Sequence, residues 1–359
     1  MQGRSTVIHW TRHETARHAS ILSIGRATPT LRVTQEESFR LSGYAHERIR
    51  RIFLNSGIDY RHFYFDGAPR LDETSDQLND RYLSGALRTG CRAARASLNA
   101  AGLSPRDVDL LVVCSSTGYI CPDLGSRLIG HMGFRRDTQR ASMTGLGCAG
   151  AIPSLQRAAD FARSHLGRVS LVVAVEMCSA CYYVDDTLET VVGNAICADG
   201  AAAVLLTSSP ARTVPYPAIV DFESFLDPDH VQTVGLEHRN GKLRIILGTE
   251  VRHLAAPLIE GALTPLLGRN GLSRSDVRFW VTHPGGRKVI EQVQKALRLT
   301  DDQLRFSRSV LRQYGNMSSP TVLFVLEEVA RAGCPRPGDW GVMIALGPGM
   351  AAEVALLQW

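Results

Sequence analysis

The sequence predicts an α/β protein made of two related halves, and two observations carry this prediction. Short apolar segments alternate with segments whose apolar residues recur at helical spacing, the pattern of an α/β fold with largely buried sheets. Three segments of the first half also return in the second half, in the same order. With 359 residues, 44% of them hydrophobic, the chain is long enough for two domains or two fused halves.

The first repeated segment predicts a short strand in each half. GLSPRDVDLLVVCSSTG at 102–118 returns as GLSRSDVRFWVTHPGG at 271–286. Each copy contains a helix end at Gly-Leu-Ser, an Asp-Val link and then an apolar run of strand length.

The second repeated segment predicts a glycine-containing turn followed by an amphipathic helix. MTGLGCAGAIPSLQRAADFAR at 143–163 is answered by YGNMSSPTVLFVLEEVAR at 314–331. The third predicts a glycine turn that enters an apolar strand, with DGAAAVLLTS at 199–208 and GPGMAAEVALLQ at 347–358. Three matched elements in one order indicate a duplication.

The duplication predicts the domain organisation. We expect an N-terminal half over residues 1–210 and a C-terminal half over residues 211–359. The segment 209–240 is rich in proline and polar residues, so we interpret it as the connection between the halves plus an irregular excursion.

The duplication also predicts a site. Cys148 in the first half corresponds, within a residue, to Asn316 in the second half, and His283 ends the second copy's predicted strand. If the halves pack about a pseudo-two-fold axis, these three side chains meet in one central region.

Those three side chains suit carbon–carbon bond formation. Cys148 precedes a predicted helix whose free N–H groups favour the thiolate, and a nearby imidazole would stabilise that thiolate as an ion pair. Such a thiolate attacks thioesters and other acyl groups. Asn316 and His283 can donate hydrogen bonds to the enolate that forms when a malonyl thioester loses carbon dioxide.

Five strings in the sequence carry a family resemblance: GCAGA around Cys148, HPGG at 283–286, YGNMSS at 314–319, WGVMIALGPG at 340–349 and ILSIGRATP at 21–29. With them the chain resembles the type III polyketide synthases, the chalcone synthase-like family, over nearly its whole length. HPGG, GNMSS and GPG together separate this group from the ketoacyl-ACP synthase III branch, which shares only the types of the three catalytic residues.

The resemblance implies the thiolase fold, in which duplicated αβαβα layered halves are related by a pseudo-two-fold axis. It implies that Cys148 carries the growing acyl chain and that His283 and Asn316 serve decarboxylation and oxyanion stabilisation. The substrates would be an acyl-CoA starter and malonyl-CoA, and the assembly a homodimer, with no organic cofactor and no metal. An acyl carrier protein is a further candidate partner, for delivery of the starter.

The resemblance also implies substrate-binding positions. Arg48 and Arg51, in HERIRRIF, match the family's basic contacts to the CoA phosphates, whereas Asn55 occupies a third such position. Cys121 matches the loop that reaches into the partner subunit's site. The remaining positions match the elongation cavity, the turn after His283 and the loop that shapes the cyclisation pocket: Ser116, Thr117, Ser318, Gly286, Gly347, Pro348 and Gly349.

Two departures from the plant chalcone synthases predict the starter. Cys197 and Ile245 match two phenylalanines that guard the junction between CoA tunnel and cavity, and EMCSAC puts Cys178 and Cys181 where threonines stand. Smaller side chains at the junction leave space for a flexible alkyl chain, and bacterial relatives that make alkylpyrones or alkylresorcinols carry similar strings. We therefore expect a medium- or long-chain fatty acyl starter, iterative condensation with malonyl-CoA, and cyclisation to an alkylpyrone or alkylresorcinol.

Other interpretations of the same residues stay open. A ketoacyl synthase III-like enzyme would perform a single condensation with CoA or carrier-protein thioesters, and a catalytically silent homologue would act as a scaffold. Gly145, Gly147 and Gly150 have the G-x-G-x-x-G spacing of a dinucleotide loop, but the preceding DTQRASMT makes a poor strand, so we expect the glycines to serve the thiol. Cys178-x-x-Cys181 lacks a second ligand pair for zinc, so we expect thiols that line a pocket.

Composition narrows the function classes. The net charge of +5 is mild and no long Lys/Arg run occurs, which disfavours nucleic-acid binding and fits anionic small substrates. The sequence has no apolar stretch of about 18 residues and no signal-peptide pattern, so we expect a cytoplasmic protein without a membrane partner. In that compartment the eight cysteines are expected to be reduced thiols.

Overall fold

The computed structural model describes residues 18–65, 72–208, 215–248 and 250–359. A nine-stranded sheet runs through it in the order β11-β12-β13-β8-β1-β7-β6-β4-β5. Its strands are β1 (Ala19–Ala27), β4 (Leu110–Cys114), β5 (Gln139–Met143), β6 (Val169–Met177), β7 (Asp199–Thr207), β8 (Ala218–Leu226), β11 (Val277–Thr282), β12 (Trp340–Gly347) and β13 (Ala351–Gln358).

The strand order repeats on the two sides of the β1–β8 pair. Moving outward, β1, β7, β6 and β4 on one side correspond to β8, β13, β12 and β11 on the other. β4 and β11 each run parallel to their inner neighbour, whereas β7 and β13 run antiparallel to both of theirs. This correspondence is the duplication that the sequence predicts.

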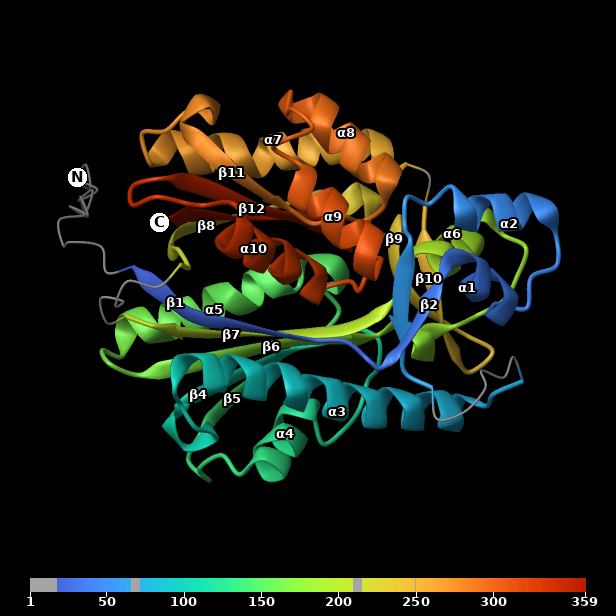
Figure 1. Cartoon of the computed structure of the whole chain (residues 1–359), viewed down its shortest axis with the longest axis horizontal. Helices are drawn as coiled ribbons and strands as arrows, with labels where there is room; N and C mark the ends of the chain where they lie inside the picture. The colour runs from blue at the N-terminus through green and yellow to red at the C-terminus, as the bar shows by residue number, and fades with distance from the viewer. Residues whose placement is uncertain (1–17, 66–71, 209–214, 249) are drawn as a thin grey trace, which may run out of the picture.

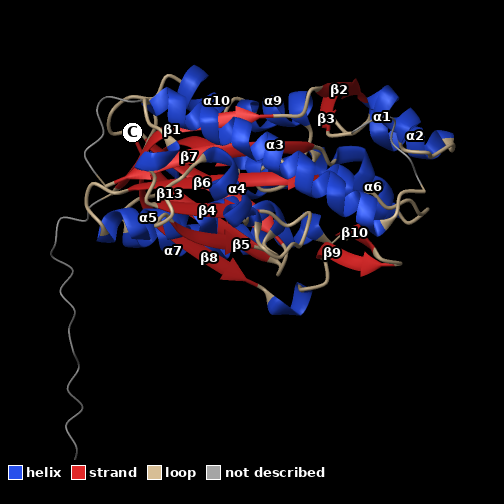
Figure 2. Ribbon diagram, turned by 90° about the horizontal axis from the view of Figure 1, so that it is seen from below, coloured by secondary structure: helices blue, strands red, loops and turns tan. Residues whose placement is uncertain are grey.

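The two halves of the sheet form separate layers that face each other across a central pair of helices (Figure 1). The central pair is α5 (Ala151–Ser164) and α10 (Pro320–Ala332). The outer helices are α3 (Ser75–Ala101) and α4 (Leu124–Met132) on one side, and α7 (Val251–Arg269) and α8 (Arg287–Leu297) on the other. Seen from below, α3 and α4 lie across β7, β6 and β4 (Figure 2). The resulting αβαβα order is the thiolase fold, and the fold prediction is confirmed.

Alternate residues of β7 pack against different helix layers, which explains why this strand is apolar throughout. In β7, Val204 and Leu206 belong to the core cluster around α5 and α10. Ala203 and Leu205 belong to the cluster beneath α3. Because successive side chains of a strand point to opposite faces, a sheet buried on both faces needs apolar residues at both the odd and the even positions.

The repeated Gly-Leu-Ser segments also fold alike. Ser104 and Ser273 each begin a 3₁₀ turn in which the serine N–H and hydroxyl donate to an aspartate three residues later, at 2.6–2.7 Å. Each turn leads into a strand, β4 or β11, as expected.

Two expectations about local structure are wrong. Segment 209–240 is not an irregular excursion, because it contains β8, a central strand paired with β1 and β13. The polar residues of β8 are explained by ion pairs of Asp221 and Glu223 with Arg269 of α7.

The residues before Gly145 do form a strand, β5, which lacks an apolar pattern because it lies at the sheet edge with its side chains largely exposed. The boundary between residues 210 and 211 lies outside the described residues and stays a prediction.

A smaller group of elements lies beyond one end of the layers, at the right of Figure 1. It contains two antiparallel strand pairs, β2 with β3 and β9 with β10, and three helices. The bounds are β2 (Leu31–Thr34), β3 (Tyr60–Phe63), β9 (Val234–Arg239), β10 (Lys242–Leu247), α1 (Gln35–Leu41), α2 (Glu47–Leu54) and α6 (Leu188–Ile196). A further helix, α9 (Arg305–Tyr314), precedes the turn that leads to α10. None of the helices in the described part of the chain combines the length and apolarity needed to cross a bilayer.

Candidate active site

Cys148 lies in a 3₁₀ turn, Gly147–Ala149, directly before α5. Gly147 has a φ of +50°, and a Cβ at this position would lie 2.7 Å from Cδ of Pro348. At Gly150 a Cβ would lie 2.5 Å from Sγ of Cys114. Gly147 and Gly150 are thus explained by the close packing around the thiol turn, as expected, whereas a Cβ at Gly145 would meet open space and only its φ of +76° favours glycine.

The backbone of Asn316 is held against the end of α6. Its N–H donates to the carbonyl of Ile196 at 2.8 Å, and its carbonyl accepts from the N–H of Ala198 at 2.9 Å. The preceding Gly315 has a φ of +71°, and a Cβ there would lie 3.0 Å from the same Ile196 carbonyl. These contacts place Asn316 beside Cys197, its partner in an isolated β-bridge.

The side chain of Asn316 is fixed at both ends and points at the nucleophile. Its Oδ1 accepts from the N–H of Ser318 at 2.8 Å, and its Nδ2 donates to the carbonyl of Gly285 at 3.3 Å. The amide atoms lie 3.9 Å from Sγ of Cys148. The predicted meeting of residues from the two halves therefore occurs.

His283 follows β11 directly, and its N–H donates to the carbonyl of Ile344 at 2.8 Å, which extends the β11–β12 ladder by one residue. Its side chain lines a cavity of about 50 Å³ together with Cys148 and Asn316. We call this the nucleophile cavity. Neither ring nitrogen of His283 has a hydrogen-bond partner among the described residues, so both are available to a substrate or to the thiol.

Burial opposes charge on both the thiol and the imidazole. It raises the pKa of Cys148 to about 12, although hydrogen bonds from Ser318 and Asn316 act in the opposite direction. It lowers the pKa of His283 to about 4. The helix N-terminus alone therefore does not produce the thiolate that the sequence predicts. Transfer of one proton from sulfur to imidazole charges both groups at once, and the opposite charges then stabilise each other.

Two larger cavities adjoin the nucleophile cavity. The inner cavity, of about 290 Å³, shares Cys148, Asn316 and Leu247 with it. The outer cavity, of about 380 Å³, shares Gly285 and Leu247 with it and begins at Arg51, whose side chain is 73% exposed. The three cavities are thus neighbours between the surface beside α2 and the thiol.

Most of the predicted substrate-binding residues line these cavities. In the nucleophile cavity lies Gly347, and in the outer cavity lie Arg51, Asn55 and Gly286. In the inner cavity lie Ser116, Thr117, Cys178, Cys197, Ile245, Ser318 and Pro348.

Four predicted residues are not brought to the cavities of this protomer. Arg48 is exposed on α2, and Cys121 is exposed in the loop after β4. Cys181 is fully buried behind the cavity wall, where its thiol donates to the carbonyl of Thr117 at 3.3 Å. Gly349, with a φ of +137°, is not among the residues that line the three cavities.

Glu176 is a buried carboxyl group that the sequence analysis missed. Its Oε2 accepts from the N–H groups of Ser116 and Thr117 at 2.9 and 3.0 Å, and its Oε1 accepts from the hydroxyl of Ser319 at 2.8 Å. The hydroxyl of Ser116 in turn accepts from the N–H of Gly147 at 3.0 Å. Glu176 thereby ties the thiol turn to the segment that carries Asn316. Burial raises its pKa to about 7.

Two cations at the mouth of the outer cavity were also missed. Arg287 and Lys288 begin α8 and line this cavity with Arg51. Arg287 also forms an ion pair with Glu291 one turn along α8, at 3.8 Å, whereas Lys288 has no ion pair with a described residue. The signal was available in the sequence, because both residues follow HPGG directly.

All eight cysteines are free thiols. Across the residues that the structure describes, no group of three or more His, Cys, Asp or Glu side chains is placed to hold a metal ion.

Fold and site together define a class: a thiolase-fold condensing enzyme whose nucleophile comes from one half and whose hydrogen-bond donors come from the other. Residues 25–215 match the family described as "FAE1/Type III polyketide synthase-like protein". Residues 222–359 match "Chalcone and stilbene synthases, C-terminal domain". The chain belongs to the type III polyketide synthase family, enzymes that condense malonyl-CoA iteratively onto an acyl-CoA starter.

Individual relatives agree with this assignment. The chain is 33% identical to the 3,5-dihydroxyphenylacetyl-CoA synthase of Amycolatopsis balhimycina, over 94% of this chain and 92% of the relative. It is 33% identical to the 1,3,6,8-tetrahydroxynaphthalene synthase of Streptomyces peucetius subsp. caesius, over 96% and 94%. Among solved structures, PKS-I from the brown alga Ectocarpus siliculosus superimposes with a TM-score of 0.88 at 30% identity, over 97% of this chain and all of the other. The tetrahydroxynaphthalene synthase of Streptomyces coelicolor A3(2) gives 0.86 at 27% identity, over 95% and 99%.

Proposed function

We propose that the protein extends a medium- or long-chain fatty acyl starter with malonyl-CoA and cyclises the product to an alkylpyrone or alkylresorcinol. The observation that carries the proposal is the wall of the inner cavity. Cys178, Cys197 and Ile245 line it within one cavity that also contains Cys148. None of these three side chains has a ring, which supports the proposal because smaller side chains leave more room for a flexible alkyl chain, although Tyr119 also lines the cavity.

In the proposed reaction the thiol proton of Cys148 passes to His283, and the sulfur attacks the carbonyl carbon of the starter thioester. The CoA thiolate leaves and takes up a proton. Malonyl-CoA then binds in its place with its thioester oxygen near Asn316 and His283. Loss of carbon dioxide leaves an enolate that the two donors stabilise, and the enolate carbon attacks the acyl group on Cys148. The bond between the acyl carbon and Sγ then breaks, so the Cys148 thiolate leaves and the lengthened chain is held on CoA.

The outer cavity provides the binding site for CoA in this proposal. Arg51, Arg287 and Lys288 place three cations at its mouth, although Asn55 contributes no charge there. Phosphate groups are bound most strongly by such charge-assisted hydrogen bonds. A carrier protein as the donor of the starter stays a prediction.

The test is mass spectrometry of the products formed from malonyl-CoA and acyl-CoA starters from acetyl to palmitoyl. We expect cyclised triketides or tetraketides, with the highest kcat/KM for medium or long starters. Preference for short or aromatic starters would contradict the proposed substrate, and a linear β-ketoacyl thioester would favour a single-condensation enzyme. The same starters presented on an acyl carrier protein decide between the two modes of delivery.

A second candidate is a hydroxylated aromatic product without an alkyl chain. The observation that favours it is the set of names of the relatives, a 3,5-dihydroxyphenylacetyl-CoA synthase and a 1,3,6,8-tetrahydroxynaphthalene synthase. Incubation with malonyl-CoA alone separates the candidates. Rapid formation of an aromatic product without any starter supports the second candidate and contradicts the first.

We also propose that the protein is a homodimer. The support is the edge strand β5, which follows β4 at the end of the sheet and has no further strand beside it in the described part of the chain. Exposed strand edges favour pairing with another chain. Light scattering coupled to size-exclusion chromatography gives the assembly's mass directly.

A further inference from the structure

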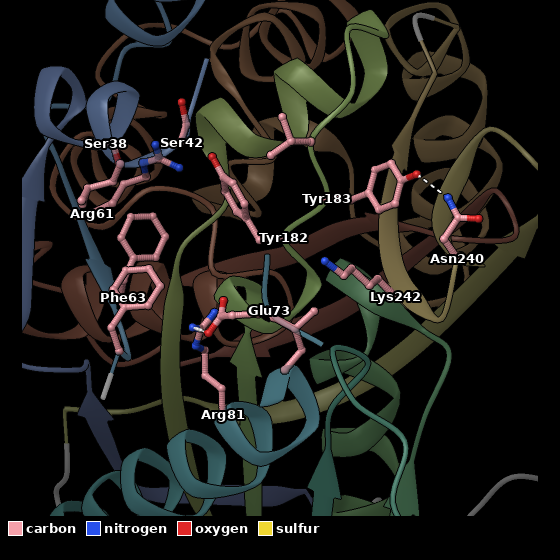
Figure 3. A pocket seen from close by; sticks show the side chains of 14 residues that line it. Ser38, Ser42, Arg61, Phe63, Glu73, Arg81, Tyr182, Tyr183, Asn240 and Lys242 are labelled. Atoms are coloured by element: carbon pink, nitrogen blue, oxygen red, sulfur yellow. Dashed lines mark hydrogen bonds and ion pairs between the residues drawn. The ribbon is translucent and has the colours of Figure 1, made fainter. Parts of the chain in front are cut away.

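A fourth cavity lies apart from the three catalytic ones, among α1, β3, the start of α3 and the β9–β10 hairpin (Figure 3). Its volume is about 290 Å³, near the lower end of the range for small-molecule sites. None of the residues that line it lines the nucleophile, inner or outer cavity. It is therefore a separate compartment that the proposed reaction does not use.

The wall of this cavity carries a buried guanidinium group without an acidic partner. Arg61 is 1% exposed, and its donors meet only neutral oxygens: Nε donates to Oε1 of Gln35 at 2.8 Å, and Nη1 donates to the carbonyls of Asn194 and Cys197 at 2.7 Å. Nη2 makes no hydrogen bond with the residues that the structure describes. Asp199 acts on this guanidinium electrostatically but does not form an ion pair with it. A buried charge without a directly paired counter-charge is disfavoured, so this site favours binding of an anion.

The rest of the wall is also more positive than negative. Arg81 lines it but is paired with Glu73, the only carboxylate among the lining residues that the structure describes. Lys242 on β10 lines the opposite side and forms no ion pair with any described residue. The described part of the lining therefore carries three cations and one anion.

A polar atom without a partner lies on the same side as Arg61. Ser38 on α1 is 3% exposed, and its Oγ is buried with no hydrogen-bond partner among the described residues. Ser38 and Arg61 both line the cavity, and α1 packs beside β3, which carries Arg61. A ligand carboxylate placed here would accept from the hydroxyl and the guanidinium together.

The body of the ligand would meet aromatic rings. The cavity is lined by Phe63, Phe65, Tyr182 and Tyr183 (Figure 3). The rings of Phe63 and Phe65 lie 5.6 Å apart, close enough for a third ring to pack against them. A ligand with a flat apolar body and a single anionic end matches this lining.

We infer that this cavity is a binding site for a small aromatic carboxylate, whose carboxylate is held by Arg61 and Ser38 and whose ring packs among the four aromatic side chains. The inference does not depend on the starter or product of the condensation. It adds a ligand site to the chain outside the path of the substrates.

The test is calorimetric titration of the full-length protein with phenylacetate, with coenzyme A present at saturation so that the outer cavity is occupied. We expect saturable binding of one phenylacetate per chain. Phenylacetamide, which has the ring without the charge, and inorganic phosphate, which has the charge without the ring, should each bind at least tenfold more weakly. Equal binding of phenylacetate and either control would overturn the inference.

Two variants locate the site. Ser38→Ala removes the buried hydroxyl of this cavity that has no partner among the described residues, and we expect phenylacetate to bind about tenfold more weakly. Lys242→Gln removes a cation and should weaken binding severalfold, more so at low salt. Lys295→Gln, on the exposed face of α8, is the matched control and should leave binding unchanged. If both cavity variants bind phenylacetate as the wild type does, with unchanged circular dichroism, the ligand does not occupy this cavity.

Discussion

The amide of Asn316 is held by hydrogen bonds at both of its ends, so it meets the substrate without having to reorient. This rigidity suits a donor that must stabilise an enolate at the moment of its formation. Cys148, in contrast, is needed only to carry the acyl group. Substitutions of Asn316 and of Cys148 should therefore affect decarboxylation and condensation differently.

We predict that Cys148→Ala retains decarboxylation of malonyl-CoA and loses condensation entirely. Asn316→Ala should lose decarboxylation by a factor of about 100 to 1,000, the usual effect of removing one oxyanion donor. Release of labelled carbon dioxide from malonyl-CoA measures the first activity, and product formation measures the second. Asn316→Asp is the isosteric control and should be as inactive as alanine, because a carboxylate repels the enolate. Decarboxylation that survives in Asn316→Ala would contradict the assigned role.

A second residue-scale prediction concerns the charge of the thiol. If His283 accepts the proton, then His283→Gln removes the imidazolium that would offset the cost of a buried thiolate, and burial keeps the pKa of Cys148 well above its usual value. The thiolate fraction at pH 7 then falls, and alkylation of Cys148 by iodoacetamide should slow at least tenfold. The rate is followed by mass spectrometry of the peptide that contains Cys148. Equal rates in the variant and the wild type would show that the imidazole does not activate the sulfur.

The sequence predicted those residues that short strings and the internal repeat mark. Cys148, His283 and Asn316 meet because they occupy matched ends of repeated elements, which a single chain reveals. Glu176 was missed because its partners, Ser116 and Ser319, are 60 and 143 residues away and follow no spacing rule. Its burial and raised pKa exist only once three segments are packed together.

At the scale of elements, the start of α8 is the feature with a direct functional consequence. Arg287 and Lys288 lie in its first turn and line the outer cavity, where the CoA phosphates are proposed to bind. The double variant Arg287→Ala/Lys288→Ala should raise the KM for acyl-CoA by roughly tenfold or more and leave kcat nearly unchanged. Steady-state kinetics at two salt concentrations measure this effect, since the wild type should lose affinity with salt more steeply.

Lys295→Ala provides the matched control on the same helix. This lysine lies in the last turn of α8 and is exposed, away from the outer cavity. Its KM should equal that of the wild type. An unchanged KM in the double variant as well would place the phosphates elsewhere.

The sequence predicted the strands whose burial produces a clear apolar pattern and missed the strands whose burial does not. β7 and β13 are buried on both faces, so their apolar runs identify them. β5 is an exposed edge strand, and β8 carries charged residues that pair with α7, so neither has the expected period. Their strand character comes from neighbours in the sheet rather than from their own side chains.

At the scale of the whole molecule, Glu176 makes stability depend on pH. Its pKa is about 7 in the folded protein and near 4.5 when exposed, so the folded state keeps a proton that the unfolded state has already lost. Unfolding between these pH values releases that proton, and stability from this group falls as pH rises through the window. The fall is at most about 1.4 kcal/mol per pH unit.

Glu176→Gln should remove this fall, because the amide stays neutral and its oxygen can still accept from Ser116 and Thr117. We expect the variant to gain stability relative to the wild type between pH 5 and pH 7, as measured by chemical denaturation at a series of pH values. Asp199, whose pKa burial raises to about 6, acts in the same direction in both proteins and so cancels in the comparison. Parallel pH profiles for the two proteins would contradict the assignment.

The contact between the thiol turn and the loop at Gly347 and Pro348 limits how this enzyme can diversify. A Cβ at Gly347 would lie 2.6 Å from Cβ of Ala149, just as one at Gly147 would meet Pro348. A mutation that reshapes this loop to alter product would therefore displace the nucleophile as well, and most such variants would be lost to selection. Cys197 is constrained as well, because its β-bridge ties it to Asn316, so we expect new products to evolve more readily through Ile245, which lines the inner cavity from β10.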